Sequence, residues 1–311
     1  MTYIFLKRVC VAVSIAATMS FFSTAIAENN ADTALQALGR MKMDARWSLR
    51  VPKETLVSYS GVVSFDKAGT TSASMLYPAP GGIAGLLAAV ITHSVIVDSA
   101  KSAQKTQFQE EADKVLSPYQ PILSNFTNKE LMQRGLEKTE VGGGKRLIDF
   151  ADKSQADWYL ESTPQFSLTQ DQRAIIMENT VSVYAALGPS EPVYQNTVRI
   201  VSSAYTEMTP PNYWTDNQGE KLKDESARLF AESLSLLFKD ISANNGKEEY
   251  PQKTIRYLEG GNEKMERGGI IQEHCNRLVF KTLRGWLMSV PSRHAQPDLT
   301  QQCEAKQSKL M

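Results

Sequence analysis

The sequence predicts an α+β fold, in which antiparallel strands form one or two sheets and two helices pack on them. Several segments alternate apolar and polar residues with a period of two, and one has the apolar spacing of an amphipathic helix. The C-terminal part contains short strand-like segments separated by turns. The chain has 311 residues, of which 42% are hydrophobic, enough for a sizeable core.

The first predicted strands form a β-hairpin. Residues 56–65 and 70–77 are rich in β-branched and aromatic side chains, and the turn sequence Asp-Lys-Ala-Gly at 66–69 separates them. Pro78 follows the second segment and ends it.

A long helix with a glycine-rich start is expected over residues 80–117, because no helix breaker occurs before Pro118. Its first half is apolar nearly all round over 83–97, and small residues recur at four-residue spacing on one face of the helix: Gly81, Gly85 and Ala89. This face could insert into a membrane or drive self-association, or it could pack closely on the protein's own sheet. The apolar run spans only about 22 Å against a hydrocarbon core of about 30 Å, which favours packing within the fold.

Two further helices have clearer signals. Thr127 followed by Glu130 is a capping box for a short helix over 128–138. Residues 221–241 form the cleanest amphipathic pattern, with acidic residues early and Lys239 late. Between these helices, Gly142-Gly143-Gly144 marks a boundary between an N-terminal subdomain, 28–141, and a strand-rich subdomain, 142–311, unless the two form one domain.

The strand-rich part contains two groups of strands. The first group is expected at 157–162, 173–187 and 193–204. In the middle one, Ile175, Met177, Val181 and Val183 share one face, which predicts a sheet with one covered face and one wetter face. The second group predicts a C-terminal β-meander at 254–259, 267–273, 277–283 and 286–290.

Residues 1–27 predict export. Lys7 and Arg8 precede an apolar stretch, and Ala25-Ile26-Ala27 offers a signal-peptidase site before a polar segment. An uncleaved anchor is the competing interpretation, which the small residues of the cleavage site disfavour. We expect a periplasmic or secreted protein that retains no membrane span after cleavage.

Cysteine usage agrees with export. Cys275 and Cys303 remain after cleavage, and an oxidising compartment would allow them to form a disulfide that closes a loop of about 28 residues. Two free thiols and intermolecular pairing are the alternatives.

The composition argues against several classes of ligand. The chain has 34 basic and 34 acidic residues and no basic patch of the kind that binds nucleic acid. Gly142-Gly143-Gly144-Lys145 lacks the spacing of a phosphate loop, and no zinc-ligand spacing or serine hydrolase motif occurs. We therefore expect no metal and no cofactor.

The layout resembles a group of exported bacterial envelope proteins of unknown function. The similarity rests on the Pro80-Gly81-Gly82 helix start and on short segments in the strand-rich part: 168–171 (Leu-Thr-Gln-Asp), 193–197 (Val-Tyr-Gln-Asn-Thr), Arg277, Gly285 and 289–291 (Ser-Val-Pro). The resemblance implies a bacterial envelope setting and transfers no catalytic residue.

Three functional hypotheses follow. The first is a non-enzymatic binding, accessory or assembly factor for another envelope protein or an envelope polymer, with Tyr213 and Trp214 as possible partner contacts. Alternatively, Trp214 holds its loop onto the following helix. The second hypothesis is a hydrolase with an unrecognised site that includes Asp171 or His93, although a lone histidine in an apolar run is more typical of the core. The third is a membrane-associated or self-assembling protein that uses residues 81–97.

N-terminal sequencing of the native protein tests the export prediction. We expect the mature chain to begin at Glu28, because signal peptidase cleaves after the small residue Ala27. Recovery of Met1 on an intact chain in the bacterial cytosol would contradict it.

Overall fold

A computed structural model describes residues 46–63, 98–141, 144–150, 152, 156–186, 191–205, 211–243, 250–274 and 276–293. Several predicted features lie outside these ranges: the signal 1–27, the small residues Gly81, Gly85 and Ala89, His93, and the cysteines Cys275 and Cys303. Among the residues that the structure describes, no helix combines the length and apolar character needed to cross a membrane.

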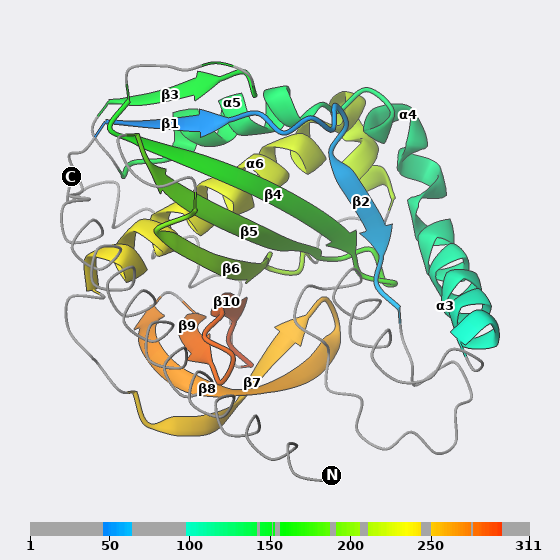
Figure 1. Cartoon of the computed structure of the whole chain (residues 1–311). Helices are drawn as coiled ribbons and strands as arrows, with labels where there is room; N and C mark the ends of the chain where they lie inside the picture. Colours follow the sequence, from blue (N-terminus) through cyan, green and yellow to red (C-terminus); the bar gives the residue numbers. More distant parts are fainter. Residues whose placement is uncertain are drawn as a thin grey trace, which may run out of the picture.

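The described strands form one mixed ten-stranded sheet in the order β3-β1-β4-β5-β6-β10-β9-β8-β7, with β2 paired to β4 beside this path (Figure 1). The strands are β1 (Trp47–Arg50), β2 (Ser58–Gly61), β3 (Lys145–Ile148), β4 (Trp158–Leu168), β5 (Ile175–Ala185), β6 (Tyr194–Val201), β7 (Gln252–Glu259), β8 (Asn262–His274), β9 (Arg277–Thr282) and β10 (Leu287–Pro291). The predicted C-terminal meander is confirmed, since β7, β8, β9 and β10 pair in sequence and antiparallel.

The sheet is not wholly antiparallel, which corrects the predicted pairing. β1 pairs in parallel with both β3 and β4, and β10 pairs in parallel with β6. β2 also pairs in parallel with the second half of β4, whereas the predicted hairpin partner of this region, 70–77, lies outside the described residues. Strands from both sides of Gly142-Gly143-Gly144 therefore belong to one sheet.

The helix α3 (Asp98–Asp113) covers the outer edge of β2. The Gly61 amide donates to Asp113 Oδ1 at 2.7 Å, and Gln109 Nε2 donates to the Gly61 carbonyl at 3.2 Å. A Cβ at position 61 would lie 1.9 Å from the Ala112 carbonyl oxygen, so this approach requires glycine. Side chains of α3 thus satisfy an edge that could otherwise pair with another strand.

The long predicted helix ends earlier than expected. α3 stops at Asp113 and continues as a 3-10 helix, η2 (Lys114–Tyr119), which contains Pro118 and leads into the single turn α4 (Gln120–Leu123). A proline ring disfavours α-helical backbone in the residue before it, and a short 3-10 segment accommodates it. Only the part from Asp98 onward is described.

The two later helices, α5 (Asn128–Lys138) and α6 (Asn212–Ala243), follow the sequence closely. Thr127 caps α5 by accepting a hydrogen bond from the Glu130 amide at 3.2 Å, as the capping box predicts. α6 is interrupted at residues 216–219, where Asn217, Gln218 and Gly219 have positive φ angles. The regular part of α6 after this interruption corresponds to the helix predicted over 221–241.

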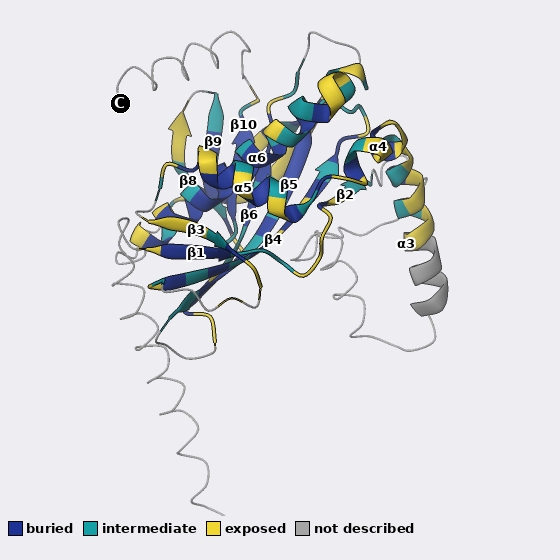
Figure 2. Ribbon diagram, turned by 90° about the horizontal axis from the view of Figure 1, so that it is seen from above, coloured by how far each residue is buried: buried dark blue, intermediate teal, exposed yellow. Residues whose placement is uncertain are grey.

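Helices α5 and α6 lie on one side of the sheet (Figure 2), and the larger of the two hydrophobic cores is formed by side chains of these helices and of the sheet. Ile175, Met177, Val181 and Val183 are buried in this core, which confirms the covered face predicted for this strand. Asn179 lies on the same face and is fully buried; it joins Ser162 Oγ at 2.6 Å and Ser233 Oγ of α6 at 2.9 Å.

A second, smaller core lies within the C-terminal half, formed by eight buried side chains: Ile176, Val201, Ile255, Tyr257, Leu278, Phe280, Met288 and Val290. β7 approaches β10 through an isolated bridge between Tyr257 and Ser292, so the sheet curls over this core. Asp171, in the turn between β4 and β5, joins this turn to the β7–β8 turn, because its Oδ2 accepts a hydrogen bond from the Gly261 amide at 2.7 Å.

Replacing Gly135 with alanine tests the contact between α5 and α6. A Cβ there would lie 2.5 Å from Phe230 Cδ1, and Phe230 is fully buried. We expect the free energy of unfolding to fall by about 1–2 kcal/mol, because overpacking costs about 1–3 kcal/mol and the gain in helix propensity is at most about 1 kcal/mol. Denaturant unfolding measures it. The exposed Gln133→Ala substitution on the same helix is the control, and equal stability of the two variants would contradict this packing.

Candidate functional site

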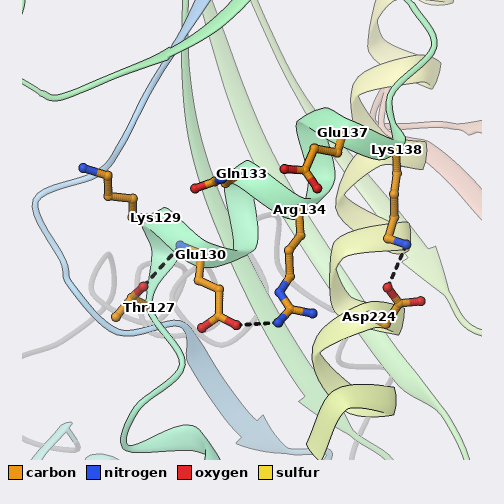
Figure 3. Close-up of a pocket in the computed structure, with 8 residues that line it drawn as sticks. All are labelled: Thr127, Lys129, Glu130, Gln133, Arg134, Glu137, Lys138 and Asp224. Atoms are coloured by element: carbon orange, nitrogen blue, oxygen red, sulfur yellow. Dashed lines mark hydrogen bonds and ion pairs between the residues drawn. The ribbon is translucent and has the colours of Figure 1, made fainter.

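A surface groove of about 680 Å³ follows the line between α5 and α6 (Figure 3). All of its lining residues are polar or charged: Thr127, Lys129, Glu130, Gln133, Arg134, Glu137, Lys138 and Asp224. We take this groove as the candidate functional site, because it joins charged groups from two helices in one concave surface.

Helical spacing arranges the α5 residues in two stripes. Residues four apart lie on the same helix face, so Glu130, Arg134 and Lys138 form an inner stripe that turns toward α6. Lys129, Gln133 and Glu137 form an outer stripe along the open side of the groove (Figure 3). The buried face of α5 holds the helix in place through Leu131, Met132 and Leu136.

The inner stripe is joined to α6 by ion pairs. Arg134 binds Glu220 through two hydrogen bonds, of 2.8 and 3.2 Å, and also lies 2.9 Å from Glu130 Oε1. Lys138 Nζ lies 2.7 Å from Asp224 Oδ1, and Lys223 Nζ lies 3.3 Å from Glu130 Oε1. Positive and negative groups therefore alternate along the groove.

These pairs are partly solvated and individually weak. The side chains of Arg134 and Glu220 are 29% and 43% exposed, and those of Lys138 and Asp224 are 37% and 59% exposed. Exposed ion pairs contribute at most about 1 kcal/mol each. The hydrogen bond from Arg134 lowers the pKa of Glu220, so this carboxylate stays charged under mildly acidic conditions. Weak pairs of this kind can exchange partners with charges brought by another molecule.

The outer stripe is left for contacts with a ligand. Within the described part of the chain, Gln133 and Glu137 make no hydrogen bond or ion pair, and Lys129 has only a 3.6 Å ion pair with Asp149. The groove thus presents a cation near the start of α5, an amide in the middle and a carboxylate near the end.

The aromatic pair predicted for partner contacts lies elsewhere. Trp214 is 3% exposed, and its Nε1 donates to the Gln172 carbonyl at 2.7 Å. Tyr213 is partly buried and stacks on Tyr205 with a centroid distance of 4.0 Å, while Lys221 Nζ lies 4.6 Å from its ring centroid. Neither Tyr213 nor Trp214 lines the groove.

Asp171, considered as part of a hydrolytic site, lies in the turn between β4 and β5. Its carboxylate accepts hydrogen bonds from Thr169 Oγ1 at 2.5 Å, from the Arg173 amide at 3.1 Å and from the Gly261 amide. Burial opposes the charged form, but these hydrogen bonds outweigh it and lower the pKa of Asp171. Both oxygens are thereby engaged in fixing two turns, and His93 lies outside the described residues.

Of the residues that line the groove, the sequence pointed only to Thr127 and Glu130, as the cap of the helix over 128–138. The pattern of charges four apart on α5 was a usable signal for a solvated helix face. The α6 side of the groove comes from residues about ninety positions later, and no local pattern relates the two helices.

Among the described residues, no group of three or more histidine, cysteine, aspartate or glutamate side chains could hold a metal ion. No protein-family model, curated protein or solved structure matches the chain.

Substituting Arg134 by methionine tests the electrostatics of the groove. We expect the pKa of Glu220 to rise toward its ordinary value, because the hydrogen bond that favours its charged form is lost. A lowered carboxyl pKa stabilises the fold above the unfolded-state pKa, so the stability lost by the variant should shrink as pH falls through the pKa of Glu220. NMR titration of the side-chain carboxyl carbon measures it. Lys264→Met on β8 is the control, and an unchanged Glu220 pKa in Arg134→Met would contradict the pairing.

Proposed function

We propose that the protein is an exported, non-enzymatic binding factor that holds a charged segment of another envelope protein in the α5–α6 groove. The observation that carries this proposal is the outer stripe, in which Gln133 and Glu137 have no partner within the described residues. The neighbouring ion pair between Lys138 and Asp224 is weak enough to exchange partners. The export part rests on residues 1–27, which predict a periplasmic or secreted location.

The stripe favours a partner with both signs of charge. Lys129 and Glu137 are eight residues apart on one helix face, which places them about 12 Å apart along the axis. A partner segment with an acidic and a basic residue at that separation would pair with both. The groove is neutral overall within its lining, so neither a polyanion nor a polycation matches it.

The groove also supports a particular kind of binding. Its lining has no large apolar side chain, and such anchors carry most of the energy of tight interfaces. Charge pairs at exposed sites instead raise association rates and are screened by salt over about 8–10 Å. We therefore expect rapid, reversible and salt-sensitive binding, which suits an accessory or assembly factor.

Site-specific photocrosslinking in native cells tests the proposal. A photoreactive residue at Gln133, in the middle of the outer stripe, should capture one envelope protein. The same residue at Met265 on β8, which is 58% exposed, should not capture it. Reversing the charge in Glu137→Lys should lower the yield of this adduct about fivefold, since removal of one surface ion pair costs up to about 1 kcal/mol.

The control for charge reversal is Lys264→Glu, on an exposed position of β8. It should leave the adduct unchanged. Equal capture from Gln133 and Met265, or an adduct that is insensitive to Glu137→Lys, would contradict the groove as the binding site.

A further inference from the structure

The second core covers part of the face of the sheet turned away from α6, at Ile176 and Val201, and the rest of this face carries an ordered polar surface across β4, β5 and β6. Thr163, Thr180 and Thr197 lie directly opposite one another on the three strands. The hydroxyl groups of Thr180 and Thr197 are 3.2 Å apart, and Thr163 is exposed. We call this row the threonine ladder. It is independent of the groove, because α6 and the sheet separate the two surfaces (Figure 2).

The charged groups beside the threonine ladder form ion pairs with one another. On one side, Arg50 Nη1 donates to Glu161 Oε1 at 2.8 Å. On the other side, Arg199 joins Glu178, its direct neighbour on β5, and also Glu259 of β7 at 2.8 Å. These two arginines and three glutamates leave one excess negative charge beside the threonine ladder, which gives no electrostatic attraction for a polyanion such as a nucleic acid.

Uncharged hydrogen-bonding groups and aromatic rings complete the surface. The side chains of Gln165 and Gln195 are exposed on the same face, and Gln195 Nε2 donates to Ser182 Oγ at 3.1 Å. Tyr159 and Tyr184 lie opposite each other on β4 and β5, and the Arg50 guanidinium lies 4.7 Å from the Tyr159 ring centroid. Amides and hydroxyls both donate and accept, and tyrosine adds an apolar ring with a polar tip.

We infer that this face binds an uncharged carbohydrate chain. A sugar polymer offers what the surface can pair with: hydroxyls that donate and accept, and flat C–H faces that pack on tyrosine rings. The large exposed hydrophobic residues of the described part, Leu56, Phe150, Met265 and Leu283, all lie outside β4, β5 and β6, so this face offers none of the apolar anchors that dominate tight protein interfaces. The chemistry of the side chains therefore favours a neutral polysaccharide over a polypeptide or a nucleic acid.

Binding to immobilised neutral polysaccharides tests this inference. The purified mature chain would be passed over a set of uncharged glucans and N-acetylglucosamine polymers, with an acidic polysaccharide and an unrelated extended peptide as comparison ligands. We expect retention on at least one neutral polymer. The Thr163→Val/Thr180→Val/Thr197→Val variant should bind it at least about tenfold more weakly, because each lost hydroxyl removes about 1 kcal/mol of hydrogen bonding.

Valine has nearly the shape of threonine and suits a strand, so the variant should fold, and circular dichroism checks that it does. Thr254→Val, at an exposed position of β7, is the matched control and should bind like the parent chain. Failure to bind any neutral polymer, binding only to the acidic polymer or the peptide, or unchanged binding by the folded triple variant would each overturn the inference. Photocrosslinking from Gln133 in the triple variant tests the groove separately. Carbohydrate binding by the sheet face and protein binding by the groove can therefore be contradicted independently.

Discussion

The packing of α6 against β4, β5 and β6 is the contact on which the rest of the structure depends. Its apolar side chains, among them Leu229, Phe230 and Leu237, are fully buried, and Asn179 adds a buried hydrogen bond to Ser233. A buried amide without partners would be costly, so this bond fixes where the helix lies along the strands. α5 packs on α6, with Gly135 beside the Phe230 ring, and the groove exists only because α6 is held there.

The parts of the fold that were predictable from sequence are those with local signals. The cap at Thr127, the amphipathic part of α6 and the meander each arise from neighbours within a few residues. The parallel strand pairs could not be predicted in the same way. β1 pairs with β3 and β4, which follow it by about a hundred residues. The residue pattern within a strand does not indicate which other strand it will pair with.

The same distinction applies to the candidate site. Glu130 and Arg134 are four apart and could be read as a helix-surface pair. Glu220 reaches Arg134, and Asp224 reaches Lys138, only through the tertiary packing of α5 on α6. The wetter sheet face was predictable from the alternation in β5, but the threonine ladder required the register of three strands. Trp214 had a strong sequence signal and is buried at the start of α6.

The position of β10 has a consequence for how the chain acquires its structure. β10 is the last described strand along the sequence, yet it lies inside the sheet, between β6 and β9. The meander β7–β9 therefore joins the hydrogen-bonded sheet of the central strands only once residues 287–291 are in place. A polypeptide secreted in the direction that residues 1–27 predict would expose β10 after every other described strand. The described sheet would then be completed only after residues 287–291 had crossed, so the preceding strands would cross before their final pairing was available.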